Sequence, residues 1–188
     1  MEKLIKYLLQ FGQLNEQQIE LIKSKVKERH LKKDEYFSEA GKIPNEVMFL
    51  LEGVLRVCYY NSKGDEITKF FVDENHLAAD LHNYSYKTPS SEYVQAITDC
   101  KMLVFTREVM EELSSTIIIW DDIISKVVQK GLMEKIGKLS PMLAEDAATR
   151  YREFLNRFPG LINRIPLSYV ASFLGITQSS LSRIRRNT

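Results

Sequence analysis

The chain has 188 residues, of which 44% are hydrophobic, so it is long enough to bury one large core or two modest ones. Its net charge at pH 7 is +1, but the charge is unevenly distributed. Residues 1–140 hold 19 basic and 22 acidic side chains, a net of −3, whereas residues 141–188 hold seven Arg, no Lys and three acidic side chains, a net of +4. A neutral sensor joined to a nucleic-acid-binding segment would show this division, although an ordinary solvated surface would show it too.

The composition argues against membrane, metal and disulfide classes. No stretch approaches the roughly 20 apolar residues of a membrane span, and the N-terminus lacks a signal-peptide core. The spacing of Cys58 and Cys100 fits no zinc or iron–sulfur motif, so we expect both to be buried in strands. His30, His76 and His82 are isolated, which favours ordinary surface or core roles. We expect a cytoplasmic protein without a metal or certain cofactor.

The first 105 residues change from helical to strand-like patterning. Residues 2–28 keep helical spacing, with Asn15 as the expected cap of a helix over 16–28. Beyond residue 31, short apolar runs separated by polar turns indicate an antiparallel barrel or sandwich, with strands expected at 47–51, 54–60, 66–72, 93–97 and 102–105. Between residues 73 and 92 the periodicity fails, and we expect a short helical turn at 76–81 and a polar loop at 83–91, a length that is often functional.

A long helix is predicted after Thr106, and its apolar side chains occupy more than one face. We expect one side to cover the β-domain and another to pair with a second copy of the chain, although one chain burying the whole face is the alternative. The predicted dimer contacts are Ile117, Trp120, Ile124 and Val127, with Ile123, Leu132, Met133, Ile136 and Leu139 widening the apolar face. Ser140-Pro141 is the predicted end of the helix and a hinge.

The C-terminal pattern predicts a helix-turn-helix. After an amphipathic helix over 142–158, stopped by Pro159-Gly160, residues 165–186 have the spacing of two short helices joined by a tight turn. Leu167 and Ser168 are the expected staple and cap of the first helix, and Gly175 is expected to leave it with a positive φ angle. The apolar positions expected to face the interior are Val170, Ala171, Leu174, Leu181 and Ile184.

The second helix of this motif carries side chains suited to DNA. Gln and Arg can form bidentate hydrogen bonds with base edges, while Ser and further Arg side chains can hold phosphates. The expected DNA contacts, with Thr177 also capping the helix, are Thr177, Gln178, Ser179, Ser182, Arg183, Arg185 and Arg186. The same spacing also occurs in ordinary helix hairpins.

With this order of elements, the sequence resembles the bacterial family of the cyclic-AMP receptor protein and the fumarate-nitrate regulator (Crp/Fnr), over essentially its whole length. The matching residues are Gly53, Gly64, Ala171, Gly175, Leu181 and Ser182-Arg183-Ile184. The resemblance implies an α+β fold, in which a cyclic-nucleotide-binding-like β-roll (jelly roll) with flanking helices spans 1–106, a central dimerisation helix region spans 107–140 and a helix-turn-helix spans 141–188. It implies base contacts from Gln178, Ser179 and Arg183, and no wing is expected after the second helix.

The segment that would bind a cyclic nucleotide departs from the family pattern. The family usually presents Gly-Glu-Leu and, about ten residues later, Arg-Ser or Arg-Ala, where Glu holds the ribose and Arg the cyclic phosphate. Here Ala79-Asp80-Leu81 and Ser90-Ser91-Glu92 correspond; we call this pair of segments the ligand cassette. Asp80 can accept from a hydroxyl, but Ser90 cannot neutralise a phosphate. The pocket therefore either takes another small-molecule effector, at Asp80, Leu81, Ser90 and Ser91, or is filled by its own side chains.

The sequence leaves two classes of function open. The first is a homodimeric, DNA-binding transcription regulator that does not bind cyclic AMP in the usual way, with DNA, a second copy, RNA polymerase and a small-molecule effector as expected partners. The second is a sensor or interaction module that keeps the fold without binding DNA. An enzyme is not expected, because no catalytic triad, phosphate-cradling loop or metal cluster occurs, and the adjacent carboxylates Asp121-Asp122 point apart on a helix.

Overall fold

The computed structural model describes the backbone of residues 1–186, and the side chains of residues 1–134 and 145–186. Two helices, α1 (Glu2–Leu8) and α2 (Glu16–Lys25), come first. Asn15 caps α2 as predicted: its side chain accepts from the backbone N–H of Gln18, whose side chain accepts in return from the N–H of Asn15. The helix ends at Lys25 rather than at Glu28, because Lys27–Leu31 form a strand, β1.

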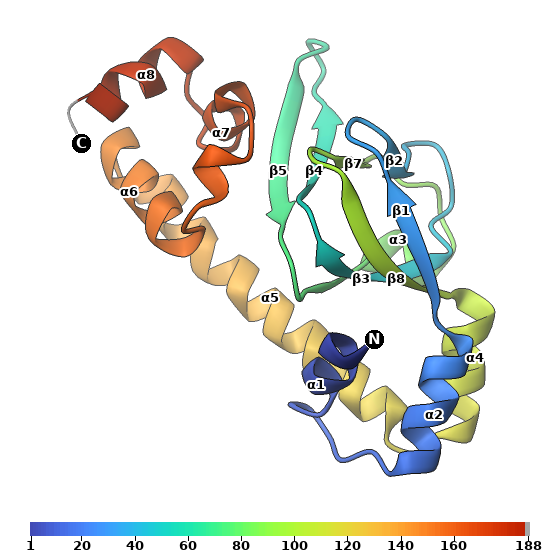
Figure 1. The fold of residues 1–188 in the computed structure, drawn as a ribbon. Helices are drawn as coiled ribbons and strands as arrows, with labels where there is room; N and C mark the ends of the chain where they lie inside the picture. The colour runs from blue at the N-terminus through green and yellow to red at the C-terminus, as the bar shows by residue number, and fades with distance from the viewer. Residues whose placement is uncertain (187–188) are drawn as a thin grey trace.

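Two four-stranded antiparallel sheets follow, which we call the roll (Figure 1). One sheet has the order β1-β8-β3-β6 and the other β2-β7-β4-β5. The strands after β1 are β2 (Tyr36–Ser38), β3 (Glu46–Glu52), β4 (Leu55–Tyr60), β5 (Glu66–Val72), β6 (Leu77–Ala78), β7 (Tyr93–Ala96) and β8 (Cys100–Thr106). All five predicted strands are confirmed, and both cysteines are buried in strands as expected. The sequence pattern did not predict β1, β2 and β6.

The space between the two sheets is filled by side chains that alternate inward along the strands. Met48 and Leu50 of β3 meet Leu55 of β4 and Ala96 of β7 there, and all four are buried. The opposite face of the first sheet is covered by α1, α2, α4 (Arg107–Thr116) and α5 (Trp120–Ala144). Trp120, 1% exposed, lies against Phe105 of β8 with ring centroids 6.1 Å apart.

The segment from residue 76 to 91 differs from the prediction. The expected helical turn at 76–81 contains the short strand β6, and the expected polar loop begins with a helix, α3 (Leu81–Tyr86). The helix starts here because the carboxylate of Asp80 accepts from the backbone N–H of Asn83 and so satisfies an N-terminal donor. It ends at Lys87, whose φ angle is +53°.

Helix α5 runs beyond its predicted end. The sequence predicts that Ser140-Pro141 terminates it, yet the helical backbone continues through Pro141 to Ala144. Proline disfavours a helix interior because it lacks an N–H and crowds the preceding turn, but good helix-forming residues on both sides can carry the helix past it. The end falls instead before Asp146, which caps α6 (Ala147–Arg157) through the N–H of Thr149.

The C-terminal residues 145–186 form a small helical unit, which we call the head. After α6 come a 3-10 turn, η1 (Leu161–Asn163), and the helices α7 (Leu167–Phe173) and α8 (Gln178–Arg186). Gly175 leaves α7 with a φ angle of +66°, as predicted. Ser168 is not the cap of α7: Pro166 occupies that position and gives no side-chain hydrogen bond. Helix α5 joins the head to the roll, and α7 lies next to the edge strand β5 (Figure 1).

The two family glycines that precede β4 and β5 differ in what surrounds them. Gly53 has a φ angle of +103°, and a Cβ there would lie 2.6 Å from the Asp99 carbonyl oxygen and 2.6 Å from Cys100 Sγ. Gly64 has a φ angle of +83°, with nothing within 4 Å of the same position. Glycine is therefore needed at position 64 only for the positive φ angle. At position 53 it is needed for the positive φ angle and also for the close approach of the chain at the start of β8.

We predict that Gly53→Ala lowers the free energy of unfolding by about 3 kcal/mol or more, because backbone strain and overpacking add. The matched variant Gly64→Ala should cost about 1 kcal/mol, from strain alone. Urea denaturation followed by circular dichroism measures both. Equal losses in the two variants would contradict the close-approach explanation.

Candidate nucleic-acid interface and ligand cassette

Helix α8 is held on the head by one buried side and by its own cap. The Thr177 hydroxyl accepts from the backbone N–H of Ser180 at 3.2 Å, which confirms the predicted cap. Leu181 is fully buried against α7, and Ile184 packs at the margin of the same core. Because Leu181 and Ile184 face the core, the other side chains of α8 point away from it.

The opposite side of α8 presents the predicted DNA-contacting residues together. Six are exposed and Ser182 is half-buried; the exposed ones are Thr177, Gln178, Ser179, Arg183, Arg185 and Arg186. No acidic residue follows Glu153 in the sequence, so the surface of α8 carries no carboxylate of its own. Three guanidinium groups on one exposed helix, beside amide and hydroxyl groups, can bind phosphates and hydrogen-bond base edges.

The head packs directly on the outer face of the second sheet. Phe71 of β5 meets Phe173 of α7 and Phe154 of α6, with ring centroids 5.4 and 6.1 Å apart. Val54 and Ile97 extend this contact, so one continuous apolar cluster spans the roll and the head. The positions of α7 and α8 relative to the roll are therefore set by side-chain packing as well as by the chain connection.

The ligand cassette is occupied by hydrogen bonds among its own residues. The Ser90 hydroxyl, 4% exposed, donates to Asp80 Oδ2 at 2.6 Å, and the side-chain amide of Asn83 donates to the same oxygen at 2.9 Å. Burial raises the pKa of the Asp80 carboxyl, but the hydrogen bonds from Ser90 and Asn83 outweigh it and hold this pKa below its usual value. Asp80 therefore stays ionised and already has its donors.

The other cassette residues do not complete a phosphate site. Leu81 and Ser91 are exposed, so of the four predicted ligand residues the structure brings only Asp80 and Ser90 together. Glu92, beside Ser90, forms an ion pair with Lys69 of β5. Where the family uses an arginine, this chain has the buried hydroxyl of Ser90 and a lysine that is already paired.

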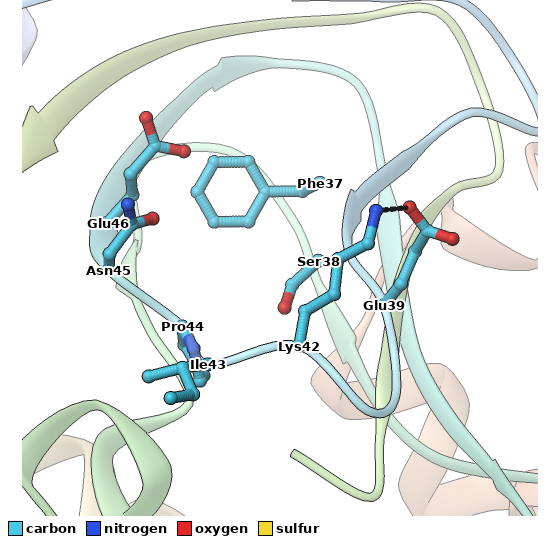
Figure 2. A pocket seen from close by; sticks show the side chains of 8 residues that line it. All are labelled: Phe37, Ser38, Glu39, Lys42, Ile43, Pro44, Asn45 and Glu46. Atoms are coloured by element: carbon cyan, nitrogen blue, oxygen red, sulfur yellow. Dashed lines mark hydrogen bonds and ion pairs between the residues drawn. The ribbon is translucent and has the colours of Figure 1, made fainter. Parts of the chain in front are cut away.

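A small hollow lies at the loop that joins β2 to β3 (Figure 2). It measures about 110 Å³ and is lined by residues 37–39 and 42–46; Lys42 and Glu39 form an ion pair of 2.5 Å at its edge. The loop is tied to the cassette, because the backbone N–H of Ser90 donates to the Lys42 carbonyl and that of Gly41 donates to the Ser90 carbonyl. Nucleotide-sized ligands need several hundred Å³, so this hollow is too small for one.

The residues predicted for the dimer contact lie mostly inside the chain. Ile117, Trp120 and Val127 are 0%, 1% and 5% exposed, and Ile124 is half-buried against the same core. The three buried side chains cover the roll and α1 and are not available to a second copy, whereas Ile124 keeps part of its surface exposed. Leu132 and Met133, further along α5, are 51% and 66% exposed.

Sequence reasoning missed a buried charge under the head. Arg56 of β4 is 1% exposed and forms an ion pair with Glu66 of β5, Nη1 to Oε2, at 2.7 Å. Its guanidinium also donates to Gln95 Oε1 at 2.7 Å and lies 3.6 Å from the ring centroid of Tyr169 on α7. The available signal was an arginine within the apolar run 54–58, where a charged side chain requires a buried partner.

The described part of the chain offers neither a metal cluster nor a membrane-spanning helix. Among its residues, no group of three or more His, Cys, Asp and Glu side chains is arranged to hold a metal ion. Within the same residues, no helix has the length and apolar character needed to cross a membrane.

This architecture is similar to that of known proteins. Residues 28–116 match the family model of the cyclic nucleotide-binding domain. FixK2 from Bradyrhizobium japonicum has a TM-score of 0.72 at 15% identity, covering 86% of this chain and 83% of its own. The c-di-GMP responsive global regulator CLP of Xanthomonas campestris also has a TM-score of 0.72, at 13% identity over 92% of this chain and 91% of its own. The catabolite activator protein of Thermus thermophilus has a TM-score of 0.59 at 18% identity, covering 96% and 85%.

No curated protein is matched by the sequence of this chain. At these identities the structural similarities establish the fold, while the family model establishes what kind of domain the roll is. Residues 28–116 therefore match the cyclic nucleotide-binding domain, and the chain as a whole shares the fold of FixK2, CLP and the catabolite activator protein.

Proposed function

We propose that this protein is a homodimeric DNA-binding transcription regulator of the Crp/Fnr type, in which α7 and α8 form the helix-turn-helix. The observation that carries the proposal is the exposed surface of α8, where Gln178, Arg183 and Arg186 stand on one helix whose other side is fixed by Leu181. In this motif the second helix enters the major groove with its N-terminal residues on base edges. Gln178, Ser179 and Arg183 are thereby assigned to bases, and Arg185 and Arg186 to phosphates. This role implies that the protein acts in the cytoplasm and contacts RNA polymerase.

Selection of bound fragments from genomic DNA, at fixed and near-physiological salt, should recover a palindrome with half-sites about 34 Å apart. Arg183→Ala should then reduce the preference for that site over random DNA by about ten-fold or more, because a bidentate base contact is lost. Arg152→Ala, which removes the same charge from exposed α6, should leave the preference unchanged and lower affinity at most uniformly.

The competing function is an interaction module that keeps the fold without binding DNA. It predicts the same weak, salt-driven affinity for every sequence, with Arg183→Ala and Arg152→Ala equivalent. That outcome would discard the regulator proposal.

We assign the dimer contact to the exposed apolar side chains of α5, Leu132 and Met133. Exposed side chains of this kind on a long helix are stabilised by packing against a second helix. Light scattering of the purified protein should give about twice the 21.8 kDa of one chain, and Met133→Asp should give the mass of one chain. Gln129→Asp, one turn earlier and exposed, is the control and should remain dimeric. A wild-type protein that stays monomeric at micromolar concentration would contradict the assignment.

The sensor domain, we propose, does not bind cyclic nucleotides in the family's usual way. The carboxylate that would hold a ribose hydroxyl already accepts from Ser90 and Asn83, and Ser90 stands where an arginine would neutralise the phosphate. In a thermal-unfolding assay, cyclic AMP at millimolar concentration should move the midpoint by no more than about 1 °C, the same as the control AMP. A rise of several degrees with cyclic AMP alone would overturn this proposal.

A further inference from the structure

The head is attached to the roll by a polar set of contacts in addition to the apolar cluster. The backbone N–H of Thr68 donates to the Ser172 hydroxyl at 2.9 Å, and that hydroxyl donates to the Glu66 carbonyl at 3.3 Å. Since β5 is an edge strand, these backbone groups have no neighbouring strand on that side, and Ser172 of α7 takes its place. One hydroxyl thus fixes where α7 sits along β5.

Arg56 contacts the same helix, α7, from the face of the sheet on which α7 lies. Its guanidinium is held on the roll by Glu66 and Gln95, and Tyr169 of α7 covers it at 3.6 Å from the ring centroid. A desolvated guanidinium is attracted to the face of an aromatic ring, and the attraction falls away as the ring moves. The ring therefore has one favoured place over the roll.

A third contact lies just before α7. Arg164 forms a two-pronged ion pair with Glu74, at 3.0 and 2.5 Å, and Glu74 also accepts from the backbone N–H of Gly53. The three contacts, at Arg164, Tyr169 and Ser172, follow one another in and just before α7, so together they restrain the rotation of α7 as well as its distance from the roll. A bidentate arginine–carboxylate pair adds directional restraint of this kind.

None of these contacts covers the DNA-facing side of α8, whose predicted DNA contacts remain exposed or half-buried. From this arrangement we infer that the docked head is the DNA-binding pose, and that Arg56, Tyr169 and Ser172 are positioning residues that set the spacing of half-sites the dimer accepts. The inference rests on the proposed function, and it concerns the outer face of the sheet rather than the ligand cassette. Fixed heads hold two α8 helices at one separation and one rotation, which freely tethered heads cannot do.

Half-site spacing is the property that tests this inference. Each base pair inserted between half-sites moves them apart by about 3.4 Å and rotates one against the other by about 35°. The dimer with docked heads should lose about ten-fold or more in affinity for one inserted base pair, because binding geometry tolerates only fractions of an ångström and about 10–20°.

The variant Ser172→Arg places a bulky side chain between α7 and β5, and Ser168→Arg adds the same charge at an exposed position of the same helix. Across operators with zero to three inserted base pairs, Ser172→Arg should lose less than about three-fold per insertion, because freely tethered heads adjust to each spacing. Ser168→Arg should keep the wild-type profile. Affinity for a single half-site should be equal in both, which shows that each head is still folded.

A second pair of variants isolates the contact with Arg56. Tyr169→Phe keeps the aromatic face and should keep the spacing profile, whereas Tyr169→Leu should relax it. The inference is overturned if Ser172→Arg and Tyr169→Leu both retain the wild-type spacing profile, or if either binds the original operator more tightly than wild type, since docking would then oppose DNA binding. A wild-type protein without any sequence preference would instead defeat the proposed function itself, and this is known before any variant is made.

Discussion

Burial of the Arg56 guanidinium is the constraint on which the arrangement of roll and head depends. A charge removed from water is tolerated only when its neighbours replace the lost hydration. Glu66 and Gln95 pair with its two terminal nitrogens from the strands on either side of β4, its Nε has no hydrogen-bond partner among the described residues, and α7 covers it. The sheet must therefore keep β5, β4 and β7 in this order, and the head must lie over them. Apolar packing around Phe71 adds stability to the same contact, while the charge and its partners make it specific.

The sequence predicted most of the roll because its central strands are apolar on both sides. Runs such as 47–51 and 102–105 have few alternatives to a buried strand, and the structure has strands there. Strand β1, in contrast, contains Lys27, Glu28, Arg29 and His30, and is held in place by pairing with β8 rather than by its own apolar pattern. Its polarity extended the predicted helix to Glu28, because charged residues are as compatible with a helix surface as with an edge strand.

Helix α5 shows a second feature that the apolar pattern of the sequence could not predict. Apolar periodicity identified a helix with more than one buried side, but it could not tell which side faces the same chain and which faces a partner. The assignment of Trp120 and Val127 to a dimer failed because the roll and α1 cover them. The packing of the folded chain shows that Leu132 and Met133 are the exposed apolar side chains of the described part of this helix, which the sequence pattern alone could not show. The turn and the helix cap of the head were predictable, since Gly175 and Thr177 have well-defined roles there.

The ligand cassette is a third part of the molecule for which the sequence left alternatives open. The sequence left open whether the cassette keeps a pocket for another ligand or is filled by its own side chains, and the contacts of Asp80 favour the second. A ligand hydroxyl that replaced the Ser90 hydroxyl on Asp80 Oδ2 would exchange one hydrogen bond for another of similar strength. The displaced Ser90 hydroxyl would keep only its contacts with the backbone of Glu92. Binding that displaces Ser90 therefore brings no net polar gain. The contact between α7 and β5 is the part of the molecule where a small change in packing would reach α8 most directly.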